Sequence, residues 1–125
     1  MTANKLLTRH ELPNGLTLEV WDRSRPVAGD RHQVVLEARM SIPVNGATLP
    51  PELASRAEEV TAALGPELIF ARREERNFIA EAEMAGMLDD MKTRLLTLGP
   101  LYLDPPDFAP RFIRQKYKEY LEKQL

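Results

Sequence analysis

The sequence predicts an α+β domain in which helices pack on one face of an antiparallel sheet. Three observations support this prediction: a hairpin turn at residues 12–16, one long alternating strand at residues 31–42, and apolar residues at helical spacing in three later segments. With 125 residues, 43% of them hydrophobic and 29% charged, the chain has the size and composition of a single globular domain, residues 1–125.

The chain opens with a predicted hairpin. Its turn, Leu-Pro-Asn-Gly-Leu at residues 12–16, joins a proline of fixed φ to an Asn-Gly pair that tolerates positive φ. Residues 6–12 and 16–22 are therefore expected to pair. In the second of these strands, Trp21 lies on the face opposite Leu18 and Val20.

The longest predicted strand follows a loop at residues 25–30. Positions 34, 36, 38, 40 and 42 of this strand are apolar, and most positions between them are polar or charged. Because side chains on a strand alternate between its two faces, the strand has one buried side and one wetted side.

A helix and a second hairpin are expected next. The helix begins at the prolines of residues 50–51 and ends at Gly65-Pro66, since glycine adopts the left-handed cap and proline does not continue a helix. The hairpin pairs residues 68–73 with residues 76–84, and its tip carries the arginine-rich sequence of residues 72–76.

Two further helices complete the chain. The first has an apolar stripe from Leu88 to Leu98 and ends at a second Gly-Pro pair, residues 99–100. A short edge strand is expected at residues 101–103, and Asp107 is a suitable N-cap for the last helix. The predicted order is β-β-β-α-β-β-α-(β)-α, which from the long strand onward matches the split βαβ core of ferredoxin-like sheets.

Composition restricts the compartment and the partners. The absence of cysteine excludes disulfides and thiolate chemistry, and no apolar run is long enough for a signal peptide or a membrane span. We therefore expect a cytoplasmic protein that does not enter a membrane. The net charge of −2 argues against binding a polyanion through the field of the whole protein.

Two groups of residues are candidate binding sites. If the wetted side of the sheet stays open, Trp21 and its neighbour Val35 form an interaction patch; if the last helix covers that side, Trp21 belongs to the core. At the hairpin tip, Arg72, Arg73 and Arg76 offer bidentate donors for a phosphate, but the two glutamates between them compete for the same guanidinium groups.

Other candidates favour structural roles. The last helix mixes basic residues with aromatics, a combination that binds nucleic acid, yet its aromatics recur at core spacing, so nucleic-acid binding is not favoured. His10 and His32 are the only histidines, and no spacing brings them together as metal ligands. Glu81 and Glu83, the one candidate acid–base pair, lie in a generally acidic stretch. No catalytic residue, metal or cofactor is predicted.

One stretch resembles a known family. Residues 12–20, Leu-Pro-Asn-Gly-Leu-Thr-Leu-Glu-Val, followed by the long strand, are similar to the opening hairpin of the insulinase-like (pitrilysin) peptidase domain, and residues 63–96 loosely follow its later pattern. Membership would imply an inverted zinc motif on the helix after the long strand. Residues 51–60 contain no histidine and the chain is too short for that domain, so the likeness is confined to local geometry.

The sequence thus predicts a non-catalytic protein-interaction or accessory module that binds an unidentified protein partner or a second copy of itself. Two alternatives stay open. One is a small-molecule or anion-binding domain that uses the arginines of residues 72–76, and the other is weak nucleic-acid binding through the last helix, for which the test residues are Arg111, Arg114 and Lys116.

Overall fold

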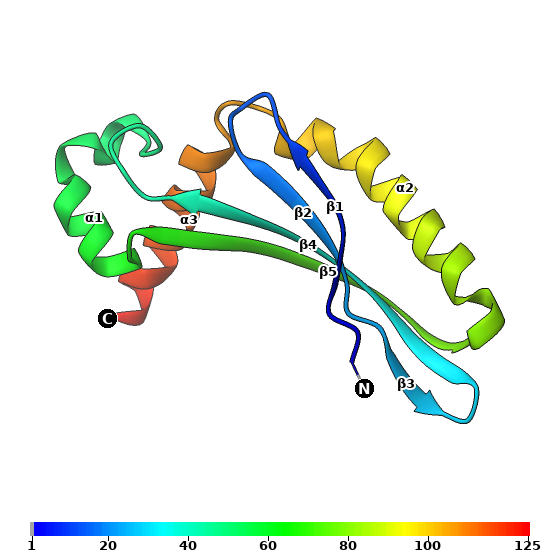
Figure 1. Ribbon diagram of the computed structural model, residues 1–125. Coiled ribbons are helices and arrows are strands. Elements are labelled where there is room, and N and C mark those ends of the chain that lie inside the picture. The colour runs from blue at the N-terminus through cyan, green and yellow to red at the C-terminus, as the bar shows by residue number, and fades with distance from the viewer. Residues whose placement is uncertain (1) are drawn as a thin grey trace.

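A computed structural model of the chain describes residues 2–125. It contains one sheet and three α-helices (Figure 1). The elements follow the chain as β1 (Lys5–Glu11), β2 (Thr17–Asp22), β3 (Arg25–Ala28), β4 (Arg31–Pro43), the 3-10 helix η1 (Pro51–Arg56), α1 (Ala57–Leu64), β5 (Glu67–Ala80), the 3-10 helix η2 (Glu81–Glu83), α2 (Met84–Leu103) and α3 (Phe108–Lys123).

All strand pairs are antiparallel, and β4 lies at the centre of the sheet. One edge of β4 pairs with β2 and then with β3, while its other edge pairs with β5 over nearly its whole length. The strand β1 pairs only with β2. β3 pairs only with β4, so the sheet has outer edges on β1, on the short strand β3 and on β5.

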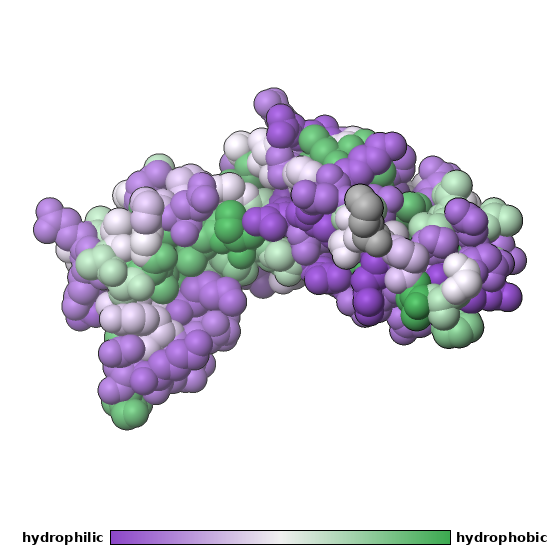
Figure 2. Space-filling view, turned by 60° about the horizontal axis from the view of Figure 1, so that its bottom comes forward, coloured by the Kyte–Doolittle hydropathy of each residue, from purple (hydrophilic) through white to green (hydrophobic). Residues whose placement is uncertain are grey.

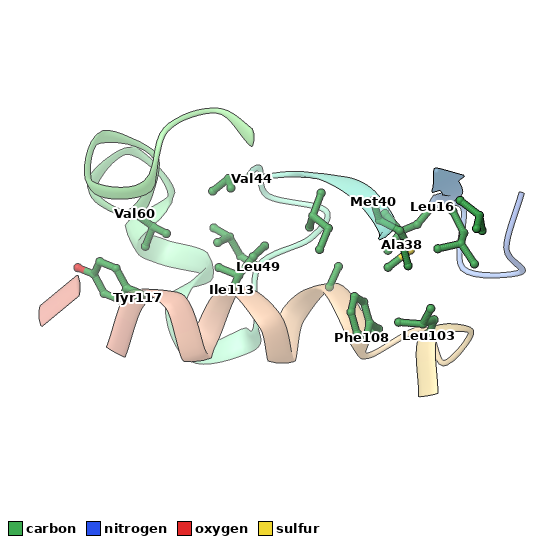
Figure 3. Close-up of a cluster of buried hydrophobic side chains, with 14 of the residues drawn as sticks. Leu16, Ala38, Met40, Val44, Leu49, Val60, Leu103, Phe108, Ile113 and Tyr117 are labelled. Carbon is green, nitrogen blue, oxygen red and sulfur yellow. The ribbon is translucent and has the colours of Figure 1, made fainter. Parts of the chain in front are cut away.

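The helices cover one face of the sheet, the face that carries the alternating apolar residues of β4 (Figure 1). Val34 and Ile42 at the two ends of this row have no exposed surface. Figure 3 shows Phe108, Ile113 and Tyr117 on the side of α3 that faces the strands and α1. The predicted α+β class, with an antiparallel sheet and helices on one face, is confirmed.

Several predicted strands are confirmed to within one residue of their expected bounds, and the helix expected from residues 50–51 begins as the 3-10 helix η1 before it continues as α1. The opening hairpin forms β1 and β2, and Gly15 in its turn has a φ of +87°. The long alternating strand is β4. The Gly-Pro pair at residue 65 ends α1, since Gly65 has a φ of +87° and its N–H donates to the carbonyl of Thr61.

The predicted loop at residues 25–30 is in part a strand. Residues 25–28 form β3 and continue along the edge of β4 that β2 leaves unpaired. The bend between β2 and β3 is held by Ser24, whose hydroxyl accepts the backbone N–H of Val35 at 3.0 Å. The proline at position 26 hid this strand from the sequence, because proline is tolerated only at strand edges.

The predicted second hairpin is wrong, because residues 67–80 form the single strand β5. The polar residues at 72–76 include no glycine, proline or asparagine to supply a turn, and β4 offers a partner along their whole length. Residues 81–84 leave the sheet as η2 and the start of α2. With one strand between α1 and α2 in place of two, the ferredoxin-like core does not form.

The second Gly-Pro pair also behaves differently from the prediction. Helix α2 continues through Pro100 to Leu103, so the edge strand expected at residues 101–103 is helical. Proline removes one helical hydrogen bond, and the buried side chain of Leu103, 3% exposed, offsets that loss by packing in the core. The last helix does begin after Asp107, although the side chain of Asp107 makes no capping hydrogen bond.

Candidate interaction site

The outer edge of β5 has no strand beside it in the described part of the chain. Val44 donates its N–H to the carbonyl of Pro66 at 2.9 Å, which sets the pattern of the β4–β5 ladder. Because hydrogen-bonded pairs alternate in an antiparallel ladder, the even residues of β5 bond to β4 and the backbone groups of the odd residues point outward. Ile69, Ala71 and Arg73 therefore present free N–H and C=O groups.

The outer edges of the sheet differ in their protection, and that of β3 is only four residues long and contains Pro26. The edge of β1 carries Lys5, Arg9 and Glu11, and its register is irregular between Leu6 and Thr8. Charge and irregularity are the usual devices that prevent a sheet edge from pairing with another chain. On β5, in contrast, residues 68–71 (Leu-Ile-Phe-Ala) contain no charge and no bulge.

A hollow adjoins this edge on the helix face, where α2 and α3 diverge above β5. One groove lies between β5 and α2, and a second lies beside α3; both are lined by Phe70 and Tyr102. Figure 2 shows the molecule as an arch with one hydrophobic patch toward the end that carries α1 and α3 and further hydrophobic surface at the opposite end. Leu98, Leu101 and Tyr102 of α2 are 56%, 81% and 58% exposed, so α2 adds apolar surface there.

Four aromatic rings form the floor and one wall of this hollow. The ring of Phe70 meets the rings of Phe108 and Phe112 edge to face, with centroids 5.5 and 5.9 Å apart. Tyr102 meets Phe108 in the same manner at 5.7 Å. Such pairs fix ring positions beyond what area burial provides, so the hollow is a shaped surface that exists before any partner binds.

Cations surround the hollow. Arg72 and Arg94 line the groove between β5 and α2 beside Glu74, and neither arginine forms a salt bridge within residues 2–125. Three basic residues of α3 are paired: Arg111 with Asp107 at 3.6 Å, Arg114 with Glu52 at 2.6 Å, and Lys116 with Glu119 at 3.4 Å.

The opposite face of the sheet is not covered by a helix and carries a network of charged side chains. Glu19 accepts hydrogen bonds from Arg9 at 2.8 Å and from the indole N–H of Trp21 at 3.1 Å. These bonds, the one from Arg9 above all, lower the pKa of Glu19. Glu37 lies 3.4 Å from Arg23 and 3.5 Å from Arg39.

Trp21 and Val35 do not form the predicted exposed patch. Trp21 lies on the open face, half-buried, with the Arg23 guanidinium 4.5 Å from its ring centroid. Its cross-strand neighbour is Glu37, whereas Val35 has no exposed surface and its carbonyl accepts the N–H of Arg23. Trp21 is therefore held by charged neighbours, and Val35 offers no surface to a partner.

The predicted arginine group is also dispersed. Arg72 and Arg73 are consecutive residues of one strand, so they point to opposite faces of the sheet. Arg72 and Arg76 share a face but are separated by Glu74 and by roughly 13 Å at the usual strand rise. The three guanidinium groups do not converge on one anion, and the expected hairpin tip does not exist.

No cluster of three or more potential metal ligands occurs among residues 2–125. His10 contacts Thr8 on β1 at 3.1 Å, while His32 lies on β4 with a buried Nδ1 that has no hydrogen-bond partner. Glu81 and Glu83 lie in η2 instead of a strand. None of the helices in this part of the chain is long and apolar enough to cross a membrane.

Sequence reasoning missed the residues that build the hollow. The sequence predicts Phe70 in a hairpin and Tyr102 in an edge strand, and neither prediction brings the two residues together. For Asn14 the sequence predicts only a turn, yet its side-chain N–H groups donate to the carbonyls of Leu103 at 2.7 Å and Pro105 at 3.1 Å. This residue ties the first hairpin to the connection between α2 and α3.

Comparison of the chain with protein-family models, curated proteins and solved structures finds no match. The similarity of residues 12–20 to the insulinase-like hairpin is therefore supported by no wider relationship.

Proposed function

We propose that this chain is a non-catalytic protein-interaction module that docks a partner chain along the outer edge of β5. The observation that carries the proposal is the uncharged stretch of residues 68–71 on the unpaired outer edge of β5, next to a preformed aromatic hollow. An exposed sheet edge gives a partner main-chain hydrogen bonds, and adjoining pockets give specificity through its side chains.

The exposed apolar side chains beside the outer edge of β5 support this proposal. Ile69 is 42% exposed on one side of the edge, and Tyr102 and Leu98 are more than half exposed on the other. Large apolar side chains grouped beside free backbone donors and acceptors are typical of protein contact surfaces. A cytoplasmic location stays a prediction from the cysteine-free composition.

The open face of the sheet is a weaker candidate for the contact surface. Its charged side chains already satisfy one another, so a partner that covers Glu19 or Glu37 removes their water without supplying new hydrogen bonds. The anion-binding and nucleic-acid alternatives are not favoured either, because the arginines of β5 are dispersed and the basic residues of α3 that were to test nucleic-acid binding are ion-paired.

The test is affinity capture from lysate of the source cell with tagged protein, quantified by mass spectrometry. Ile69→Lys places a charge on the β5 edge, and Val27→Lys is the matched control, since Val27 is 47% exposed on another strand of the same sheet. We expect one protein to be captured in stoichiometric amount by the wild type and by Val27→Lys but not by Ile69→Lys. That protein can be the untagged endogenous copy of this chain.

Two results would overturn the proposal. If no protein is captured above background in stoichiometric amount, the chain is not an interaction module. If a partner is retained by Ile69→Lys and lost by Trp21→Ala, the contact surface is the open face of the sheet and not the edge of β5.

A further inference from the structure

We infer that the chain which docks on β5 is a second copy of this protein, paired edge to edge about a two-fold axis that passes beside Phe70. This inference rests on the proposed function, because it names the partner of the same edge. It predicts a dimer in which the two sheets become one continuous antiparallel sheet, with the helices of both copies on the same face.

The sequence along the outward edge is complementary to itself in this register. Two antiparallel copies centred on Phe70 place Glu67 of one copy opposite Arg73 of the other, and the two-fold axis repeats this pair. Between these pairs, Ile69 faces Ala71 of the second copy. These odd residues are the ones whose backbone groups are free, so they form the hydrogen-bonded pairs of the new ladder.

Registers shifted toward the arginines bring like charges together. With the axis moved to Ala71, Glu67 lies opposite Glu75 of the second copy, and with the axis at Arg72, that arginine lies opposite Arg72 of the second copy. Like charges directly opposite each other on a sheet are unfavourable. With the axis moved the other way, to Ile69, Glu67 lies opposite Ala71 and the two Glu67–Arg73 pairs are lost, so charge favours the register centred on Phe70.

The helix face supports the same register. Phe70 lies opposite Phe70 of the second copy in a pair without direct hydrogen bonds, where side chains approach most closely. The ring already packs on Phe108 and Phe112 at the floor of the hollow, and Tyr102 stands at its rim. A second aromatic ring at this position covers apolar surface that the single chain leaves in water.

Charge reversal tests the register directly, with sedimentation equilibrium as the readout. The wild type is expected at twice its chain mass of 14.2 kDa. Glu67→Arg and Arg73→Glu each bring two like-charged pairs together, and we expect the dissociation constant to rise at least about tenfold in each variant. An equimolar mixture of the two variants, and the double variant alone, regain opposite charges and are expected to dimerise like the wild type.

Each outcome decides one of the two proposals. A wild type that stays at 14.2 kDa at about 100 μM overturns the second copy as partner, while the capture experiment with Ile69→Lys still tests the interaction module. A wild-type dimer whose single variants stay dimeric, or whose mixture stays monomeric, overturns this register. Circular dichroism first confirms that each variant is folded, because Arg73 also neighbours Glu37 and Glu75 within its own chain.

Hydrogen exchange tests the same pairing without any substitution. On raising the wild-type concentration from about 1 μM to about 100 μM, the amides of Ile69, Ala71 and Arg73 are expected to slow in exchange by at least about tenfold. The amides of Phe70 and Arg72, which already bond to β4, keep their rates. Equal slowing of both sets, or slowing of neither, would contradict the inference.

Discussion

Replacing Asn14 by alanine is expected to lower the free energy of unfolding by about 2–3 kcal/mol. The side chain makes three hydrogen bonds: it donates to the carbonyls of Leu103 and Pro105 and accepts the backbone N–H of Leu16 at 3.1 Å. Each such bond contributes about 1 kcal/mol net, and the partly buried carbonyls lose their donor in the variant. The φ of Asn14 is not in the left-handed region, so alanine fits the turn without strain.

The assay is urea denaturation followed by fluorescence of the single tryptophan and by far-ultraviolet circular dichroism. For a chain of this length, about 1 kcal/mol corresponds to ~4 °C in the melting temperature, so we also expect a decrease of about 8–12 °C. Both measurements use one low protein concentration, since self-association would make stability depend on concentration.

Asn77→Ala is the matched control for this prediction. The Asn77 side chain is exposed and accepts one hydrogen bond, from Gln33 at 3.0 Å, so its removal is expected to change stability by no more than about 0.5 kcal/mol. A loss of less than about 1 kcal/mol in Asn14→Ala, or equal losses in the two variants, would refute the claim that Asn14 fastens the α2–α3 connection to the first hairpin.

Three further predictions concern the core, the open face and the two Gly-Pro pairs. Ile113→Ala removes a side chain with no exposed surface and should cost about 3–4 kcal/mol in urea denaturation. Because the bond from Arg9 lowers the pKa of Glu19, the stability advantage of the wild type over Glu19→Gln should be full above the ordinary pKa of glutamate and be lost as the pH falls below it through the lowered pKa of the folded state, measured by denaturation at several pH values. Thermal denaturation should show Gly65→Ala destabilised by at least about 1 kcal/mol, since its φ is +87°, and Gly99→Ala changed by less than that, since the gain in helix propensity is offset by the contact between the added Cβ and the ring of Pro100.

Local signals in the sequence were sufficient for the first part of the fold. The turn at residues 12–16 and the alternation in β4 both depend on interactions within a few residues, and both are present as expected. The same holds for Gly65, whose left-handed backbone ends α1 and leads directly into β5. These elements needed no knowledge of the rest of the chain.

The elements that depend on contacts between residues far apart in the sequence were predicted wrongly. The charged residues at 72–76 are as polar as a turn but contain no turn-forming residue, and the long strand beside them holds their backbone extended. Gly99-Pro100 has the same two residues as the pair that ends α1, yet the core contact of Leu103 and the bond from Asn14 to its carbonyl favour one more helical turn. Local composition does not contain either contact.

The candidate site was missed for a related reason. The outer edge of a sheet can be identified only when the strand order is known, and the sequence did not predict that order. Of the residues singled out from the sequence, Arg72 and Arg73 do lie on β5, but their positions on opposite faces follow only from a continuous strand. Phe70 and Tyr102 become neighbours through the angle between α2 and the sheet, which no motif encodes.

The distribution of charge along β5 limits where a partner can pair. The second half of the strand carries Arg72 to Arg76, five charged residues in succession, which protect that part of the edge from unspecific pairing. The first half has four uncharged residues between Glu67 and the arginines. A continuous apolar edge of 14 residues would pair in many registers, whereas a short apolar stretch with a negative charge at one end and positive charges at the other accepts few. The same residues thus limit unspecific pairing and, in the dimer that we propose, favour the register that places Glu67 opposite Arg73.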